Sequence, residues 1–321
     1  MQPVSLLIGL IGLSATASCA PTTGRTSAPS GCLTVGSSGN YSKIGDALDA
    51  LGSSTASACI YIASGTYEEQ LTIQYPGNLT LYGETTDTST YKQNTVNITH
   101  TISSPEAGSL VASATVDAES DGLTMYNINI ENGFGEGHQA VALVANGDRQ
   151  GYYACQFLGY QDTLYAKGGT QYYSNSLVKG AVDYIFGASS AWFNNCDIVS
   201  NGKGYITAMS REEETDTAWY AFDSCNIKAA SGKDLTGEVY LGRPWRVLAR
   251  VIYQNSVLSD IINEKGWTTM ADGATPSYYE IDNSGDGADT SKREYESTID
   301  APVTRETVLG GDYQGWIDGS Y

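Results

Sequence analysis

Short segments in which apolar and polar residues alternate recur along the chain. In each of them an aromatic residue is followed, after two intervening positions, by a small residue and, after one more, by an apolar residue. Alternation with a period of two puts every second side chain on the same face, which is typical of a β-strand. The pattern occurs in residues 152–157, 173–178, 193–198, 222–227 and 253–258, and alternating stretches at 78–82 and 123–128 extend it upstream.

The small residues of these segments follow one another at intervals of 21, 20, 29 and 31 residues; they are Cys155, Ser176, Cys196, Cys225 and Ser256. A strand pattern that returns at such intervals predicts a solenoid in which each coil covers the next, while the variable remainder forms loops. No long helical pattern interrupts the series, and 36 Gly against 8 Pro suit many tight corners. The sequence therefore predicts an all-β fold, a single-stranded right-handed parallel β-helix.

The amino-terminal residues differ from this repeat. Residues 1–20 contain no Asp, Glu, Lys, Arg or His, and they contain an apolar run at 6–13 followed by Ala15-Thr-Ala17. The combination is typical of a secretory signal peptide, and the apolar run is too short to span a bilayer. We expect a signal peptide over 1–17, a linker over 18–31 and one folded domain over 32–321. Cleavage after residue 20 is the latest alternative. We therefore expect a secreted, extracellular protein without a membrane partner.

Both ends of the predicted stack of coils need a cover. Ser42 precedes Ile44, Ala47, Leu48 and Leu51, and this spacing predicts a short amphipathic helix over the amino-terminal end. The segment after about residue 298 lies outside the repeat, and we expect it to pack over the coils. Its apolar side chains include Val303, Val308, Tyr313 and Trp316.

Five of the six cysteines lie in the predicted folded domain, and an odd number cannot all pair with one another. Cys32 and Cys59 bracket the predicted cap helix, and in a secreted chain we expect them to form a disulfide. Cys155, Cys196 and Cys225 occupy the small-residue position of the repeat, which favours a buried stack of thiols. Cys196 and Cys225 lie on successive coils, so a bond between them is the alternative.

Other short patterns add less. The triplets at Asn40, Asn78 and Asn97 match the acceptor pattern for N-glycosylation, a pattern that also arises by chance. No CxxC or Cys/His pattern is present, and we expect no metal site.

Two amides and two carboxylates are spaced as a cluster. Gln139, Gln161 and Asp183 are separated by 22 residues each, and Asp162 follows Gln161 directly. In a chain that coils every twenty-odd residues, equal offsets return to the same face, about 4.8 Å apart per coil. An amide can stabilise an oxyanion, one carboxylate can attack and the other can transfer a proton. The spacing predicts a hydrolytic site, although a ladder of polar side chains that only hydrogen-bond along the coils would have the same spacing.

The histidines limit the other kinds of catalysis. The chain contains only His100 and His138, and it lacks a Gly-x-Ser-x-Gly motif. A Ser-His-Asp arrangement would have to use one of these two histidines, which makes it a weak candidate. His138 directly precedes Gln139, which places it either at the rim of the site or in an exposed loop. We expect His100 to be structural, and carboxylates to do the chemistry.

Five segments, in order along the chain, resemble the pectin methylesterase (pectinesterase) family, and the likeness extends from about Cys32 to the carboxyl terminus. The resemblance implies a right-handed parallel β-helix that hydrolyses the methyl esters of galacturonate in pectin without a metal or cofactor. Five ordered motifs are a far more specific signal than one short pattern. They are Gly65-Thr-Tyr-Glu-Glu69, Gln139-Ala-Val-Ala-Leu143, Gly159-Tyr-Gln-Asp-Thr-Leu-Tyr165, Val182-Asp-Tyr-Ile-Phe-Gly187 and Leu241-Gly-Arg-Pro-Trp245.

The resemblance also implies roles for matching residues. Asp183 resembles the nucleophile, Asp162 the general acid/base, Gln139 and Gln161 the oxyanion donors, and Arg243 the partner of Asp183. Trp245 and Trp267 resemble the aromatic residues that contact the sugar. Further candidates for substrate contact are Tyr160, Tyr184 and His138, although Tyr160, Tyr184 and Phe186 also suit the core or the wall of the site.

The two aspartates need different protonation states to carry out these roles. Asp183 must be ionised to attack, whereas Asp162 must be protonated to release methoxide as methanol. Arg243 beside Asp183 would lower the pKa of Asp183. The charge of Asp183, together with an apolar wall that includes Tyr160, would raise the pKa of Asp162.

The net charge of −19, from 36 acidic and 17 basic residues, excludes some partners. A chain of this sign is a poor partner for nucleic acid, and it repels a polyanionic product. With 23 Tyr and 5 Trp it suits carbohydrate contact better. We expect methyl-esterified pectin (homogalacturonan) as the partner of a monomer.

Two other classes share the predicted fold. A polysaccharide lyase or glycosidase would need calcium-binding carboxylates with a base, or two or three clustered aspartates, and it would shorten the polymer. A non-catalytic wall-binding solenoid would keep the repeat but would have no reason to gather Gln139, Gln161, Asp162, Asp183 and Arg243.

Overall fold

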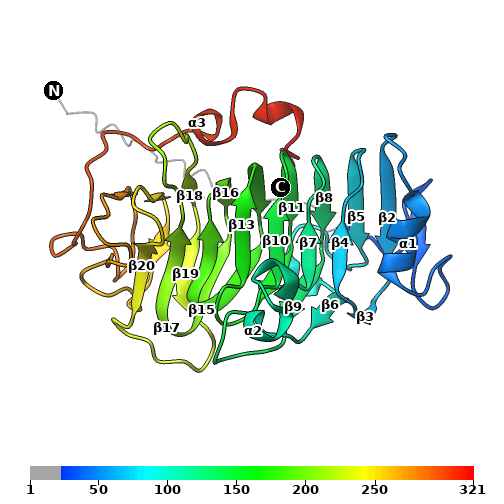
Figure 1. The fold of residues 1–321 in the computed structure, drawn as a ribbon, viewed down its shortest axis with the longest axis horizontal. Helices are drawn as coiled ribbons and strands as arrows, with labels where there is room; N and C mark the ends of the chain where they lie inside the picture. The colour runs from blue at the N-terminus through cyan, green and yellow to red at the C-terminus, as the bar shows by residue number, and fades with distance from the viewer. Residues whose placement is uncertain (1–22) are drawn as a thin grey trace, which may run out of the picture.

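The strands of successive coils pair side by side in the computed structural model, which describes residues 23–321 (Figure 1). The ladders are parallel, and they stack the coils along one axis. The predicted fold class, a right-handed parallel β-helix with a short cap helix and a carboxyl-terminal cover, is confirmed. The signal peptide predicted over 1–17 lies outside the described residues.

One sheet runs the whole length of the stack. Its ten strands, in spatial order, are β1 (Leu33–Val35), β2 (Ala58–Ile62), β5 (Leu79–Gly83), β8 (Leu123–Tyr126), β11 (Gln150–Tyr153), β14 (Thr170–Ser174), β16 (Ser190–Asn194), β18 (Tyr220–Asp223), β21 (Arg250–Gln254) and β23 (Ser277–Ile281).

A second sheet of thirteen strands forms the remaining faces. Two long strands, β15 (Leu177–Gly187) and β17 (Asp197–Met209), bend so that each belongs to both faces. The other strands are β3 (Gly65–Glu68), β4 (Leu71–Ile73), β6 (Val96–His100), β7 (Val116–Ala118), β9 (Asn129–Asn132), β10 (Leu143–Asn146), β12 (Gln156–Leu158), β13 (Leu164–Gly168), β19 (Asn226–Ala229), β20 (Val239–Pro244) and β22 (Val257–Leu258).

The aromatic residues of the sequence repeat stack inside the helix. Neighbouring rings lie 4.4–4.9 Å apart between centroids and are nearly parallel. This spacing matches the distance between adjacent strands, so each coil contributes one ring to the column. The column consists of Tyr152, Tyr173, Phe193, Phe222 and Tyr253.

The thiols at the small-residue position are also inside. Cys155, Cys196 and Cys225 are buried and free, as the stack of small side chains predicts, and the alternative bond between Cys196 and Cys225 is absent. Each of these two thiols instead points at a carbonyl of the preceding coil, Cys196 at Tyr173 O (3.6 Å) and Cys225 at Phe193 O (3.4 Å).

A left-handed residue makes the corner in front of each small residue. Because L-residues rarely adopt a positive φ, and Asn tolerates it best, this corner explains the frequency of Asn in the repeat. The corner residues are Ala154, Asn175, Asn195, Ser224 and Asn255, with φ between 50° and 57°.

The cap helix α1 (Ile44–Leu51) and the disulfide Cys32–Cys59 are both present. Ser42, expected to begin the helix, does not cap it. The helix begins after Lys43, and the Glu69 carboxylate accepts from Ile44 N and Gly45 N at 2.8 and 3.0 Å. Glu69 therefore satisfies the free N–H groups of the first turn from a later coil, a long-range contact that no local spacing could indicate.

The carboxyl-terminal segment lies across the outer face of the ten-stranded sheet (Figure 1). Helix α3 (Arg305–Leu309) buries Val308 and Leu309 against Tyr172 and Trp192. This confirms the expected cover. The short helix α2 (Ser104–Ala107) and the 3-10 turns η1 (Tyr91–Gln93), η2 (Val111–Ser113) and η3 (Tyr313–Gly315) complete the elements.

Residues 23–31, the described part of the predicted linker, are attached to the coils through Arg25. Arg25 pairs with Thr85 through the backbone, and its guanidinium donates to Gly83 O at 3.1 Å. The same guanidinium lies over the rings of Tyr82 and Tyr126. A basic residue with these partners ties the segment to the coils. Within residues 23–321, no helix is both long and apolar enough to cross a bilayer.

Candidate active site

Both predicted catalytic carboxylates occupy strained backbone positions on neighbouring coils. Asp162 has a φ of 62° and Asp183 a φ of 50°. The left-handed residue breaks the regular alternation of β15, so Asp183 and Phe186 face the cleft while Tyr184 and Ile185 both face the core. Backbone strain of this kind persists only where the surrounding structure imposes it, and it is frequent at functional sites.

The register shows which residues face one another. The pairings Leu143 with Leu164 and Leu164 with Ile185 both step by 21 residues, not by the 22 that separate the predicted cluster. Asp162 and Asp183 are therefore the in-register pair, since Gln161 bridges to Val182 directly before them.

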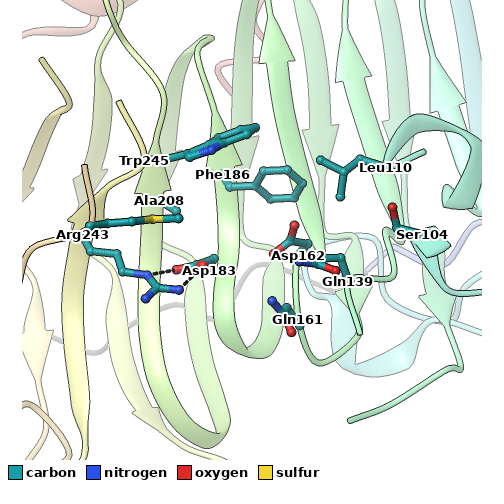
Figure 2. A pocket seen from close by; sticks show the side chains of 11 residues that line it. Ser104, Leu110, Gln139, Gln161, Asp162, Asp183, Phe186, Ala208, Arg243 and Trp245 are labelled. Carbon is teal, nitrogen blue, oxygen red and sulfur yellow. Dashed lines mark hydrogen bonds and ion pairs between the residues drawn. The ribbon is translucent and has the colours of Figure 1, made fainter. Parts of the chain in front are cut away.

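A cleft on the outside of the thirteen-stranded sheet gathers the predicted cluster (Figure 2). Gln139, Gln161, Asp162, Asp183 and Arg243 all line it, as does Trp245. The remaining lining residues are Ser104, Leu110, Phe186, Ala208 and Met270.

Arg243 and Asp183 form a bidentate ion pair across an intervening strand. Arg243 Nε donates to Asp183 Oδ1 at 2.8 Å, and Nη2 donates to Oδ2 at 2.6 Å. Arg243 lies in register with Ala208 of β17, which in turn pairs with Phe186 of β15. The Ala208 side chain is a single methyl group, so the long Arg243 side chain can pass it and reach Asp183.

The ion pair separates the protonation of the two carboxyls. Burial and the nearby charge of Asp183 together raise the pKa of Asp162 to about 8, although the charge of Arg243 lowers it. Burial also raises the pKa of Asp183, but the hydrogen bonds and the charge of Arg243 lower it. The prediction that Arg243 lowers the pKa of Asp183 is therefore correct in direction. Burial, however, raises that pKa by more than Arg243 lowers it.

The pKa of the Arg243 guanidinium is raised by the same ion pair. Burial lowers the pKa of Arg243, but the hydrogen bonds and charge of Asp183 raise it by more. Both Asp183 oxygens accept from Arg243, which is the geometry of a carboxylate. This geometry favours an ionised Asp183, and the raised pKa of Asp162 favours its protonated form, as the two roles require.

The two glutamines are held by their backbones beside the carboxyls (Figure 2). Ser104 N donates to Gln139 O at 2.7 Å, and Ala140 N donates to Gln161 O at 3.1 Å. Their side-chain amides line the cleft and offer N–H donors next to Asp162 and Asp183. An anion that forms between the carboxyls would meet these donors.

Aromatic side chains form one wall of the cleft. Trp245 lies 5.9 Å from Phe186 and 6.4 Å from Tyr165 between ring centroids, and Tyr165 and Phe186 stack at 4.4 Å. A stacked aromatic wall beside polar groups suits the apolar face of a sugar ring.

Trp267 is not part of this wall, which corrects the expectation that it contacts the sugar. Its side chain is fully buried and stacks on Tyr278 at 4.1 Å, and its indole N–H donates to Glu280 at 3.0 Å. The Arg293–Glu280 pair holds that carboxylate in the interior. Trp267 is a core residue because a later coil covers it.

Three weaker candidates also lie outside the cleft. Tyr184 is fully buried, with its hydroxyl 3.1 Å from Ser200 Oγ, so it cannot touch a substrate. His138 is exposed, and its ring lies 6.2 Å from Phe134. Tyr160 is partly exposed, and it lies outside the cleft lining and so outside the apolar wall that we expected to include it.

Sequence reasoning missed Ser104, Leu110, Ala208 and Met270. They come from helix α2, strand β17 and loops, without a chemical motif, and only the packing of the coils brings them to the cleft. In the part of the chain that the structure describes, no group of three or more His, Cys, Asp or Glu side chains could hold a metal ion.

The fold and the family match together define a carboxylic ester hydrolase. The pectinesterase family model matches residues 32–310, and the chain belongs to this family. It is 78% identical to a probable pectinesterase A of Aspergillus oryzae over 93% of this chain and 92% of that protein. It is 72% identical to a probable pectinesterase A of Aspergillus niger, with both chains covered completely.

Solved structures agree with this assignment. The crystal structure of the pectin methylesterase from Aspergillus niger superposes with a TM-score of 0.92 at 76% identity, covering 93% of this chain and all of that one. The pectin methylesterase from carrot superposes with a TM-score of 0.82 at 28% identity, covering 90% of this chain and 97% of that one.

Proposed function

We propose that the cleft hydrolyses galacturonate methyl esters of pectin with Asp183 as nucleophile. The single observation that supports these roles is the contrast between two in-register aspartates, of which only Asp183 is paired with an arginine. One carboxyl is thereby available as an anion and the other as an acid, which is what ester cleavage through an acyl-enzyme needs.

In the first half-reaction a carboxylate oxygen of Asp183 attacks the ester carbonyl carbon. The negative charge moves to the carbonyl oxygen, where the amide N–H groups of Gln139 and Gln161 stabilise it. The intermediate collapses, the bond to the methoxy oxygen breaks, and Asp162 transfers its proton to that oxygen. Methanol leaves, and the substrate acyl group is bonded to Asp183 as an anhydride.

In the second half-reaction Asp162, now an anion, takes a proton from water. The hydroxide oxygen attacks the substrate acyl carbon, and the same two amides stabilise the second oxyanion. Collapse breaks the anhydride and returns Asp183 as a carboxylate paired with Arg243. The product is the galacturonate acid, and Asp162 again carries a proton.

The roles around the chemistry follow from position. We assign Trp245 and Phe186 to contact with the sugar ring, because they form the aromatic wall of the cleft. We propose that methyl-esterified homogalacturonan binds to a monomer secreted after removal of 1–17, with the catalytic domain over 32–321. Among the glycosylation triplets, Asn40 and Asn78 are exposed, whereas Asn97 is partly buried and accepts a hydrogen bond from Asn129.

The test measures two products on highly methylated pectin. We expect methanol release with no decrease in polymer length, measured by an alcohol assay together with size-exclusion chromatography. Shortening of the polymer, or new reducing ends without methanol, would favour the lyase or glycosidase alternative. Binding of pectin with neither product would favour a wall-binding solenoid.

A further inference from the structure

The guanidinium of Arg243 has a second contact besides Asp183. Its Cζ lies 3.8 Å from the ring centroid of Tyr205, so the planar group rests on the aromatic face. Tyr205 belongs to β17, the strand between the coil of Asp183 and that of Arg243. It is partly exposed and does not line the cleft.

This arrangement constrains a long side chain on two sides. Arg243 must cross β17 to reach Asp183, and an arginine side chain loses several rotatable bonds of freedom when it is held in place. The Tyr205 face attracts the cation from one side, while the edge of the guanidinium donates to the carboxylate. The ring of Tyr240 on the next coil lies beside that of Tyr205, with the two centroids 5.7 Å apart.

We propose that Tyr205 is a positioning residue for the reaction, which holds the Arg243 guanidinium in the plane that presents Nε and Nη2 to Asp183. The proposal rests on the proposed function, in which Asp183 must be ionised to attack. Tyr205 acts on Asp183 only through Arg243. Its effect therefore reaches the rate through the protonation of the nucleophile.

The direction of the pH effect follows from the groups around Asp183. Arg243 of β20 lowers the pKa of that carboxyl, burial raises it, and Asp162 on the preceding coil shares its environment. Tyr205 faces Arg243 from β17. On the core side, the charge of Asp183 contributes to raising the pKa of Tyr278. Without the aromatic ring of Tyr205, the Arg243 guanidinium is less well ordered and its ion pair with Asp183 weakens. Asp183 then becomes protonated at a higher pH.

The experiment compares three variants of the full-length mature enzyme. Tyr205→Leu removes the aromatic face, and Tyr205→Phe keeps it. Tyr240→Leu is the matched control, because Tyr240 is a partly exposed tyrosine on the next strand that touches Tyr205. For each variant kcat/KM for methanol release is measured from acidic to neutral pH, and thermal unfolding verifies the fold.

We expect Tyr205→Leu to lower kcat/KM by about 3- to 30-fold, the range of one cation–π contact. The acidic limb of its pH profile should move to higher pH. Tyr205→Phe should keep the wild-type limb and lie within about twofold of the wild-type rate. Tyr240→Leu should leave the limb in place.

Two outcomes would overturn the proposal. One is a folded Tyr205→Leu enzyme whose acidic limb coincides with that of the wild type, which would leave only a packing role. The other is a Tyr205→Phe enzyme that loses as much as Tyr205→Leu, since the hydroxyl rather than the ring face would then matter. If Tyr205→Leu does not fold, Tyr205→Gln supplies a polar side chain without an aromatic face for the same comparison.

Failure of the proposed function would look different. If Asp183→Asn retained activity, Asp183 would not be the nucleophile, whatever the Tyr205 variants did. If Asp183→Asn were inactive and the Tyr205→Leu limb stayed in place, only the positioning role would be lost.

Discussion

Arg243 and Asp183 meet through two hydrogen bonds although 60 positions separate them in the chain. One strand, β17, lies between them, and it places Ala208 in register with Arg243. Because 8% of the Asp183 side chain and 21% of the Arg243 side chain are exposed, solvent screens this pair only partly. We expect the pair to control when Asp183 is ionised.

Replacing Arg243 by Gln should move the acidic limb of kcat/KM upward and lower the maximal rate. Arg243 lowers the pKa of Asp183, so its loss leaves burial unopposed and the nucleophile becomes protonated at higher pH. Methanol release measured from pH 3 to pH 8 tests this. An unmoved limb would show that Asp183 owes its ionisation to another group.

Replacing Asp183 by Asn should abolish turnover while the protein still folds. Loss of a covalent nucleophile typically costs several orders of magnitude in kcat. Asn tolerates a positive φ well, so the φ of 50° at this position is not an obstacle to folding. The control is an unchanged circular dichroism spectrum. A folded Asp183→Asn enzyme with near wild-type methanol release would remove Asp183 from the role.

The protonation of Asp162 should set the alkaline limit of activity. Its pKa of about 8 keeps the carboxyl protonated below that pH, and the acid is needed to release methoxide. We expect kcat/KM to fall as the pH rises through about 8, with spontaneous ester hydrolysis subtracted in a blank without enzyme. Activity that stays level up to pH 10 would contradict this.

Asp162 should also affect stability with a definite sign. Its pKa is higher in the folded than in the unfolded protein, so its contribution is full below about pH 4 and is lost as pH rises toward 8. Asp162→Asn should therefore lose less stability than the wild type between pH 5 and 8. Denaturant unfolding at several pH values measures it. Equal pH dependence of the two proteins would argue against a buried, protonated Asp162.

Substitution of Trp245 should affect substrate binding, whereas substitution of Trp267 should affect stability. Trp245→Ala should raise KM for pectin, because Trp245 lines the cleft. Trp267→Phe should leave KM unchanged and lower the free energy of unfolding by about 1–3 kcal/mol, because Trp267 is buried and donates to Glu280. Steady-state kinetics and denaturant titrations on both variants separate the effects. A higher KM for Trp267→Phe would return that residue to the binding site.

A substitution at the corner residue Ser224 should stabilise the β-helix. Ser224 is exposed and has a φ of 57°, while Asn195 and Asn255 occupy the equivalent corners of the neighbouring coils. Because Asn adopts the left-handed region more readily than Ser, Ser224→Asn should raise the free energy of unfolding by about 0.5 kcal/mol. Ser224→Val, which is β-branched, is the opposite control. A less stable Ser224→Asn protein would indicate a clash in the ladder of corner residues.

The sequence alone determines the repeat and what occupies its interior. The alternation and its return on each coil predict one inward-facing aromatic residue per coil, and the observed column of rings agrees. The small residue lies three positions further on, and the left-handed corner between the two brings it inside as well. The same reasoning places Gln139, Gln161, Asp162 and Asp183 in one cleft. The disulfide between Cys32 and Cys59 also follows from position, since the two cysteines flank the cap helix.

Only the tertiary structure decides contacts that depend on the exact register and on what covers each coil. Left-handed residues at Asp162 and Asp183 change which neighbours face outward, so Tyr184 turns into the core while Phe186 lines the cleft. Later segments bury Trp267 and supply Glu69 to the cap helix. The Arg243 side chain spans a whole strand to reach Asp183. Side-chain reach and coverage by distant loops are not periodic, and a pattern along the chain cannot contain them.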